Sequence, residues 1–351
     1  MNSGSESRRT RVQQTLACRN AGPPPFMPAI YEYKAALIDE TPSRIARDPE
    51  LLYAAIMAEY EQLAPDALCV GVDVYNIEAE AMGRRVLFFD DDRARTPIIE
   101  PQGQVPALGN SLDNAPLPNP RVDGRMPVYV EAARRVVKAL GDAVWIRGAL
   151  SGPFSLAASL VGAPNLFSAL LERPAEVHRL LRHAGSVVKQ YGQAFVDVGV
   201  GVVIFDSQAS TDLISPETFC EFVAPVAKDL IGHFQRQGLD HVPLIIGGNT
   251  APISQDCIDT GANNLLCDFS GDWPAWLAHC RAARRALRRN ISPAFIRDST
   301  PDAVHAATLK MIADASGYGG FIVGTGVLPI DTPVHNVLAI RDACTGAVTS
   351  L

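Results

Sequence analysis

Residues 243–250 read Pro-Leu-Ile-Ile-Gly-Gly-Asn-Thr, and this stretch decides the fold. An apolar run of strand length ends in two glycines and an asparagine, as a buried parallel strand does where it enters an active-site loop. The same pattern of a strand followed by polar residues recurs in residues 201–210 and 321–336. Three such segments predict parallel strands whose carboxyl ends lie together.

Outward from these segments, short apolar runs alternate with longer amphipathic ones along the whole chain. Eight strands alternating with helices give a right-handed parallel barrel, so the predicted fold class is α/β, a (β/α)8 TIM barrel. The predicted strands cover residues 26–31, 67–73, 142–150, 201–205, 242–246, 263–267, 287–291 and 320–324. The predicted helices cover residues 51–63, 126–140, 156–171, 174–198, 215–237, 273–286 and 300–315.

The predicted domain organisation is one barrel with a short arm before it. Residues 1–22 form an N-terminal arm, and residues 23–351 form a single barrel domain with an excursion at about 74–142. Within the excursion, residues 95–125 are rich in Pro, Asn and Gly and lack periodicity. A structureless loop of this length is unusual in a compact domain and is often functional, so we expect it to cross the mouth of the barrel.

The amino-acid composition restricts the kinds of partner that the protein is expected to bind. The 351 residues include 31 basic and 38 acidic side chains, a net charge of −7 that argues against nucleic acid. The basic run at 281–289 is interpreted as a solvated helix face that leads into the next strand. No apolar run is long enough to span a membrane, and no secretion signal is seen. Seven cysteines without a CxxC pair indicate reduced thiols and a cytoplasmic location.

Several motifs resemble one known family. Residues 152–154 read Gly-Pro-Phe after the third strand, and residues 204–207 read Ile-Phe-Asp-Ser at the end of the fourth. Together with Ser215-Pro216-Glu217-Thr218 and Gly248-Asn249, they resemble the uroporphyrinogen decarboxylase (URO-D) superfamily over about residues 26–345. That superfamily also contains zinc-dependent methylcobamide:coenzyme M and chloromethane-type methyltransferases, and the resemblance implies a URO-D-like barrel.

Two departures from the family pattern affect the expected chemistry. The methyltransferase branch normally reads His-x-Cys-Gly-Asn and Gly-Cys-x-x-Pro-x-x-Thr-Pro, but here Ile245, Gly247 and Gly326 replace the His and both Cys. We therefore expect no zinc at the usual family site and no other cofactor. A relocated site would draw on Asp206, Asp268, Cys267 and His335. The decarboxylases carry an arginine-rich stretch after the first strand, where this chain has Glu32, which disfavours a polyanionic porphyrinogen.

Polar residues at the strand ends are the candidate site, because barrel enzymes place their chemistry there. Asp73 matches by position an acid that meets the substrate in the decarboxylases. We expect Asp73 and Asp206 to face each other across the mouth, so that one carboxyl has a raised pKa and acts as a general acid. The expected catalytic residues are Asp73, Asp206 and Asp268. The expected substrate-binding residues are Glu32, Tyr31, Tyr75, Arg147, Gln208, Asn249 and His335, with Lys34 a further candidate anion anchor.

Three functions remain open at this point. The first is a small-molecule enzyme that resembles the methyltransferase branch, lacks its zinc and uses carboxylate acid/base chemistry. The second is a carboxy-lyase acting on a small aromatic or heterocyclic acid. The third is a non-catalytic protein that binds a corrinoid or methyl carrier. A homodimer and a corrinoid protein partner are also left open, whereas nucleic acid and membrane are not expected as partners.

Overall fold

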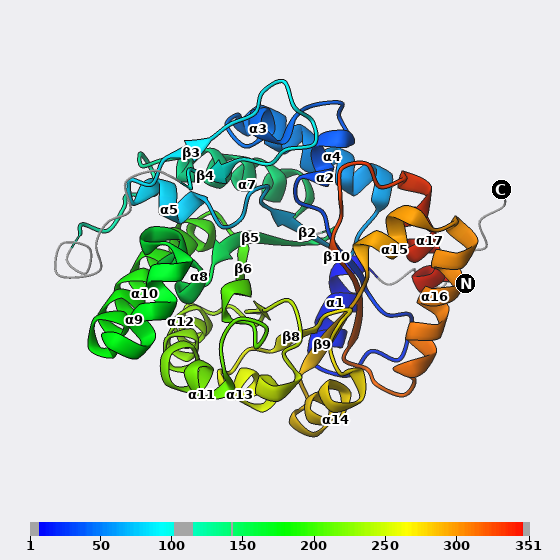
Figure 1. Ribbon diagram of the computed structural model, residues 1–351. Helices are drawn as coiled ribbons and strands as arrows, with labels where there is room; N and C mark the ends of the chain where they lie inside the picture. Colours follow the sequence, from blue (N-terminus) through cyan, green and yellow to red (C-terminus); the bar gives the residue numbers. More distant parts are fainter. Residues whose placement is uncertain (1–6, 102–114, 142, 347–351) are drawn as a thin grey trace.

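Eight parallel strands form a barrel wall in the computed structural model, which describes residues 7–101, 115–141 and 143–346 (Figure 1). They pair in the orders β1-β10-β9-β8 and β2-β5-β6-β7, and the two sheets meet along β1/β2 and β7/β8. The predicted TIM barrel is therefore confirmed. The wall strands are β1 Phe26–Ala29, β2 Ala67–Val70, β5 Trp145–Ser151, β6 Gly201–Phe205, β7 Leu244–Ile245, β8 Asn264–Cys267, β9 Ala286–Ile291 and β10 Phe321–Val327.

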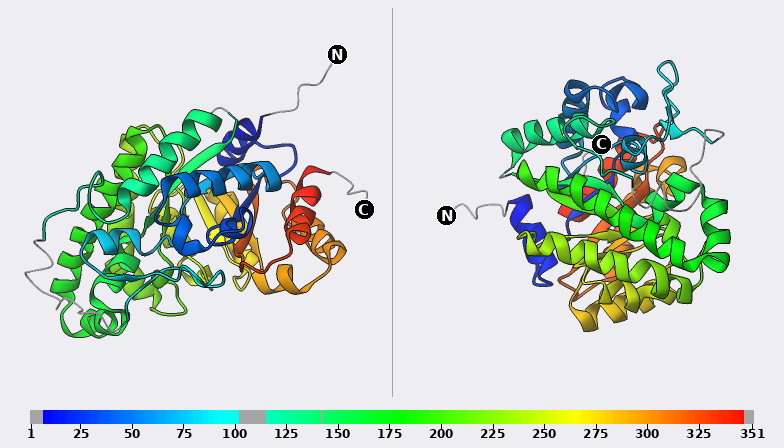
Figure 2. Two further views of the ribbon diagram at one scale, coloured as in Figure 1. Left: turned by 90° about the horizontal axis from the view of Figure 1, so that it is seen from above. Right: turned by 90° about the vertical axis from the view of Figure 1, so that its left-hand side faces the viewer.

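Helices cover the outside of this wall, and Figure 2 shows the long helix α10 running beside α12. The helices on the N-terminal half are α1 Arg8–Leu16, α2 Tyr33–Ala36, α3 Pro42–Ile45, α4 Pro49–Leu63, α5 Ile77–Ala81, α7 Met126–Leu140, α8 Pro153–Val161, α9 Ala163–Glu172 and α10 Pro174–Asp197. Those that follow are α11 Pro216–Thr218, α12 Ala224–Arg236, α13 Ser254–Asp259, α14 Trp273–Ala283, α15 Pro293–Asp298, α16 Pro301–Asp314 and α17 Val334–Thr345.

Local signals explain where many of these helices begin. A polar side chain that accepts a hydrogen bond from the first turn, followed by a proline that needs no such bond, is a favoured helix start. Asp48 caps α4 in this way, with Oδ1 2.8 Å from the Glu50 backbone nitrogen, and Thr300 caps α16. No single helix in the described part of the chain is long and apolar enough to cross a membrane, although the bent pair α8 and α9 passes that test jointly.

Two predicted helices are interrupted. The helix expected at 156–171 is divided into α8 and α9, which meet at 106° at Gly162. Gly162 has φ +83°, a conformation that glycine adopts without strain. The helix expected at 215–237 contains a π-helical turn, Phe219–Val223, just before Pro225, whose ring nitrogen cannot donate to the preceding turn. Helix α17 was not among the predicted helices.

The excursion at 74–142 reaches the barrel mouth with residues 96–98, and its helix α7 packs on the outside of the wall against α4 and β5. It contains α5, the antiparallel pair β3 Val86–Leu87 and β4 Ile98–Ile99, and α7. Part of the predicted loop at 95–125, residues 102–114, lies outside the described residues, as does residue 142.

Inward-facing side chains fill the barrel in layers. At the amino ends of the strands, Met27, Ala67, Ala286 and Ile322 pack against Val12 of α1, which closes that end. Nearer the carboxyl ends, a second apolar cluster includes Tyr31, Phe205, Ile245 and Leu266. Since the amino end is filled by apolar side chains, the open end of the barrel is the place for a binding site.

The junction of β1 with β2 uses a side chain as well as the backbone. The Asp66 backbone nitrogen donates to the Phe26 carbonyl at 2.8 Å. Further along, the buried ammonium of Lys34 donates to the carbonyls of Cys69 and Gly71, at 2.9 and 2.8 Å. Its charge is matched by Glu59, whose Oε2 lies 3.6 Å from Lys34 Nζ.

Candidate active site

A cavity of about 560 Å³ opens at the carboxyl ends of the strands. Its walls are mostly apolar, and Thr96, Pro97 and Ile98 of the excursion contribute to its lining. A concave, largely apolar pocket with a few converging polar groups is the usual form of a small-molecule site. Five of the residues expected at the site line this cavity: Tyr31, Glu32, Asp73, Tyr75 and Asp268.

Glu32 stands just before α2 and presents a half-buried carboxyl group to the cavity. Burial raises the pKa of Glu32, and the neighbouring Asp73 carboxylate adds to this effect, whereas the charge of Lys34 opposes it. No other described residue donates a hydrogen bond to its side chain. Desolvation favours the neutral form of a carboxyl group, so Glu32 is the cavity acid suited to hold a proton.

Asp268 follows β8 and is held by three donors. Its Oδ1 accepts hydrogen bonds from Asn290 Nδ2 at 2.9 Å and from the Phe269 backbone nitrogen at 3.0 Å. Its Oδ2 accepts one from the Gly248 backbone nitrogen at 3.0 Å. Gly248 has φ +80°, and a Cβ there would lie 2.1 Å from Asp212 Oδ2, so the loop after β7 requires glycine. The contacts fix the Asp268 carboxylate at the cavity wall.

Tyr75 and Ser207 form a second polar pair at the cavity. The Tyr75 hydroxyl lies 2.6 Å from Ser207 Oγ. Burial raises the pKa of Tyr75 to about 12, so its hydroxyl remains a hydrogen-bond donor near neutral pH.

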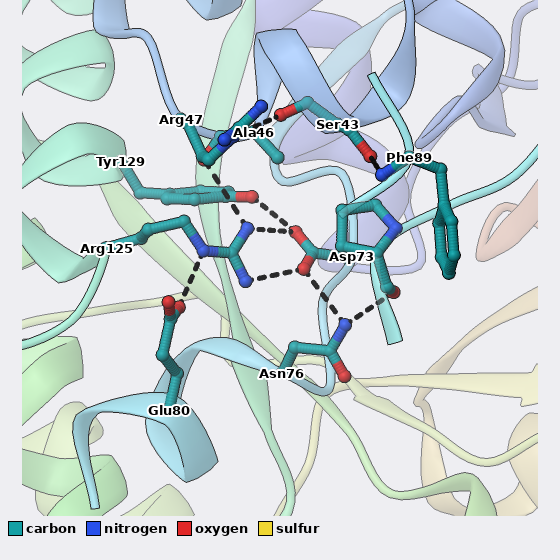
Figure 3. Close-up of polar contacts among 10 residues, drawn as sticks. Ser43, Ala46, Arg47, Asp73, Asn76, Glu80, Phe89, Arg125 and Tyr129 are labelled. Carbon is teal, nitrogen blue, oxygen red and sulfur yellow. Dashed lines mark hydrogen bonds and ion pairs between the residues drawn. The ribbon is translucent and has the colours of Figure 1, made fainter. Parts of the chain in front are cut away.

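Asp73 also lines the cavity, but its carboxylate is fully engaged (Figure 3). Arg125, at the start of α7, forms a two-point ion pair with it, with nitrogen–oxygen distances of 3.0 and 2.7 Å. The Tyr129 hydroxyl donates to Oδ1 at 2.6 Å, and Asn76 Nδ2 donates to Oδ2 at 2.9 Å. Asn76 also donates to the Pro97 carbonyl at 2.7 Å, so the network joins the end of β2 to the excursion.

Asp206 lies behind the cavity wall and is completely buried. Its carboxylate accepts hydrogen bonds from the Ser155 backbone nitrogen and Ser155 Oγ, both at 2.7 Å, and from the Phe154 backbone nitrogen at 3.4 Å. These donors are in the first turn of α8. The expected arrangement therefore differs from the observed one, because Asp73 and Asp206 do not face each other across the cavity.

Several other expected binding residues also lie away from the cavity. Gln208 is in the turn after β6 and donates its backbone N–H to Ser155 Oγ, while Asn249 and His335 are exposed on loops or helix ends. Lys34 is buried at the β1/β2 junction and does not line the cavity. Arg147 is buried inside the barrel beneath it.

The sequence analysis missed Arg288, which is buried and lines the cavity. The basic run at 281–289 is thus not wholly a solvated face, because its end forms β9. Successive strand residues point to opposite sides, so of Arg288 and Arg289 one had to point inward. That alternation was the available signal. Ser207 was missed as a cavity residue because it follows the more conspicuous Asp206.

The residues present do not fit the zinc ion that the resemblance implies. Ile245, Gly247 and Gly326 line the cavity and offer no metal-binding side-chain atom. A Cβ at Gly326 would lie 2.5 Å from Pro293 Cγ, so even a small side chain there requires the wall to move. Within residues 7–101, 115–141 and 143–346, no three His, Cys, Asp or Glu side chains gather as around a metal.

An eight-stranded parallel barrel with a partly polar cavity at its carboxyl end defines a TIM-barrel protein whose cavity has the usual form of a small-molecule site. The sequence model described as uroporphyrinogen decarboxylase (URO-D) matches residues 7–346. This chain belongs to the uroporphyrinogen decarboxylase family, as its motifs suggested.

Known relatives include enzymes of two kinds. The chain is 27% identical over 296 residues to a methylcobamide:CoM methyltransferase MtaA of Methanosarcina barkeri, covering 84% of this chain and 83% of the relative. It is 26% identical over 317 residues to a uroporphyrinogen decarboxylase of Synechococcus sp., covering 86% and 84%. Its fold matches a methyltransferase from Methanosarcina mazei with a TM-score of 0.83 at 23% identity, covering 96% and 98%.

Proposed function

We propose that this protein is an enzyme that acts on a small molecule by acid/base chemistry, with Glu32 as the proton donor. The observation that carries the proposal is a half-buried carboxyl group that lines the cavity, accepts no hydrogen bond from another described residue, and has a pKa raised by burial. A general acid works best when its pKa approaches the working pH, and burial moves the pKa of a carboxyl group in that direction without a metal. Membership in a family of enzymes supports the same proposal.

The other polar groups have supporting roles in this proposal. Asp268, fixed by Asn290 and Gly248, orients a hydrogen-bond donor of the substrate. The Tyr75–Ser207 pair offers a hydroxyl on the β6 side of the cavity. Asp73 and Asp206 are occupied by contacts within the protein and have no catalytic role here.

A carboxy-lyase is the second candidate, because the cavity holds an acid and the Arg288 guanidinium together. In that reaction the bond between carbon and the carboxylate breaks, carbon dioxide leaves, and the electron pair stays on carbon. The proton of Glu32 then forms the new C–H bond, and the Glu32 carboxylate is reprotonated from solvent. Methyl transfer, the activity named for the Methanosarcina barkeri relative, is the competing reaction within this proposal.

The test combines an activity screen with a direct measurement of the Glu32 proton. Carbon dioxide release from aromatic and heterocyclic acids, and methyl transfer from a methylcobamide to coenzyme M, are measured for the wild type, Glu32→Gln and Glu61→Gln. Glu61 is exposed on α4 and is the matched control. We expect Glu32→Gln to lower turnover by about 100-fold or more, the usual contribution of a positioned acid.

Infrared titration gives a readout that needs no substrate. Other buried carboxyl groups contribute to the protonated-carboxyl band, so the readout is a difference spectrum. The wild type minus Glu32→Gln should show protonated-carboxyl absorbance that persists above the normal range of glutamate, and the wild type minus Glu61→Gln should not. If Glu32→Gln turns over substrate at the wild-type rate, Glu32 is not the acid. If the wild type turns over none of these substrates, a non-catalytic binder of a corrinoid or methyl carrier becomes the better proposal. A homodimer, a corrinoid protein partner and a cytoplasmic location remain predictions.

A further inference from the structure

We infer that the floor of the cavity is an anion-binding subsite, in which Arg288 receives a single anionic group of the substrate and Arg147 adds charge beneath it. This inference rests on the proposed function and specifies its substrate class. The ligand is a small molecule with an apolar body and one carboxylate or similar oxyanion.

Arg288 is held in position with one donor nitrogen left over. Its Nε donates to Asn290 Oδ1 at 2.9 Å, and its Nη2 donates to the Thr325 carbonyl at 2.7 Å. Its Nη1 donates to no described residue, and the side chain lines the cavity although it is only 4% exposed. A guanidinium fixed at two nitrogens loses little freedom when the third binds an anion, and such charge-assisted bonds are strong.

The neighbouring strand is shaped to admit this guanidinium. Gly324 of β10 lies beside Asn290 in the sheet register. A Cβ at Gly324 would lie 2.1 Å from Arg288 Nε and 2.7 Å from Asn290 Oδ1. The absence of a side chain at position 324 therefore creates the space in which Arg288 lies, and the position of the guanidinium is set by the wall.

Arg147 places a second buried positive charge in the barrel. It extends inward from β5, is 4% exposed, and makes no hydrogen bond or ion pair with any described residue; its Nε is buried without a partner. Burial lowers the pKa of both guanidinium groups, and the charge of Arg147 contributes to the lowering at Arg288. Two like charges inside a barrel raise the free energy of the ligand-free protein unless an anion offsets them.

Counting the nearby carboxylates leaves one positive charge over. Glu59 is matched to Lys34, and Asp268 reaches Arg288 through Asn290. Arg147 is then the guanidinium without a carboxylate partner among the described residues. The Tyr31 hydroxyl also faces the cavity, and burial raises its pKa well above the usual value, so it remains a donor for the same anion. One anionic group on the substrate would complete the balance.

The test uses simple anions and their neutral counterparts. Acetate and benzoate, with acetamide and benzamide as uncharged matches, are titrated calorimetrically into the wild type, Arg288→Gln and Arg289→Gln. Arg289 is the adjacent residue on the same strand, but it lies over Trp273 and pairs with Asp314 at 3.2 Å, outside the cavity. We expect Arg288→Gln to weaken binding of the anions by about 10- to 100-fold, and Arg289→Gln to leave it unchanged.

A second variant disturbs the subsite without removing an arginine. Gly324→Ala keeps both arginines but displaces the guanidinium, so it should also weaken binding of the anions; thermal melting confirms that each variant is folded. The inference is overturned if folded Arg288→Gln binds the anions as the wild type does, or if the wild type does not prefer an anion to its amide.

Glu32→Gln separates this inference from the proposed function. It should lose turnover but keep binding of acetate or benzoate, because it removes the proton donor and leaves Arg288 in place. Normal turnover by Glu32→Gln together with weak anion binding by Arg288→Gln would refute the proposed acid and retain the subsite. Lost turnover in Glu32→Gln together with wild-type anion binding by Arg288→Gln would retain the proposed acid and refute the subsite.

Discussion

Asp206 illustrates how a single carboxylate at a strand end can serve the fold. Its oxygens accept hydrogen bonds from the first turn of α8, and a Cβ at Gly152 would lie 2.2 Å from its Cγ. Burial raises the pKa of Asp206 to about 6, while the hydrogen bonds from Ser155 and Phe154 oppose that rise. The side chain thus joins the end of β6 to the start of α8.

We predict that Asp206→Asn lowers stability more than it lowers activity. The amide of the variant accepts hydrogen bonds through one atom where the carboxylate uses two, and bonds to a charged group contribute about 1.5–3 kcal/mol each. Urea unfolding should show a loss of about 1–3 kcal/mol, with exposed Asp91→Asn as the control. A fully folded Asp206→Asn that loses turnover by about 100-fold would instead assign it a catalytic role.

Half of the candidate site could be read from the sequence, because the rule that strand ends carry the chemistry is a property of the fold. That rule placed Tyr31, Glu32, Asp73, Tyr75 and Asp268 at the cavity. It could not show that Asp73 is already held by Arg125, since Arg125 lies 52 residues further along the chain. Which side chains are satisfied internally depends on tertiary contacts that strand ends alone do not reveal.

At the scale of elements, α5 inserts a buried acid between the barrel and the outer helices. Glu78 of α5 accepts a hydrogen bond from the Ser151 backbone nitrogen at 2.7 Å through Oε1, while Oε2 is buried without a partner. Burial raises the pKa of Glu78 to about 8. At neutral pH this side chain is therefore mainly neutral in the folded protein and charged in the unfolded one.

This difference predicts a pH dependence of stability. Because the folded pKa lies above the ordinary value of 4.5, the folded state holds the extra proton, and stability falls as pH rises from about 4.5 to about 8. Glu78→Gln removes this contribution. Urea unfolding at about pH 5 and about pH 9 should therefore show the variant gaining on the wild type, by at most about 1.4 kcal/mol per pH unit.

Glu61→Gln on the exposed side of α4 is the control for this measurement. If the difference in the free energy of unfolding between Glu78→Gln and the wild type stays constant across this pH range, Glu78 is charged in the folded protein and the prediction is wrong.

Element boundaries were predicted less well than element types. The apolar periodicity of residues 156–171 continues through Gly162, so the sequence pattern showed one helix where the chain bends by 106°. The pattern of residues 215–237 likewise continues through the π turn that precedes Pro225. Apolar periodicity shows which face of a helix is buried, but it carries little information about the direction of the helix axis.

At the scale of the whole molecule, the barrel was predictable because eight strand patterns at regular spacing leave few alternatives. The closing of its amino end by α1 was not predicted, since residues 8–16 have weak apolar periodicity. Only Val12 of that helix joins the cluster inside the barrel, with Leu16 packed against it. Two apolar residues in a polar helix give too weak a signal to locate it.

We predict that the purified protein holds clearly less than one zinc ion per chain. Position 245 is filled by an isoleucine, and positions 247 and 326 carry no side chain, so the barrel mouth lacks the donors for a tetrahedral site. Elemental analysis after dialysis against zinc gives the measurement. One zinc per chain that is lost in Asp268→Asn would show a relocated site and contradict the prediction.

At the junction of β1 and β2, the Lys34 side chain takes the place of a continuous ladder of backbone hydrogen bonds. Where β1 and β2 part, two carbonyls of the β2 segment are joined to α2 by one ammonium group, itself balanced by Glu59. The stability of this junction therefore depends on one buried side chain and its carboxylate partner. Local breathing of the barrel, the slow opening that lets amide protons exchange with solvent, should begin here, directly below the first turn that carries Glu32.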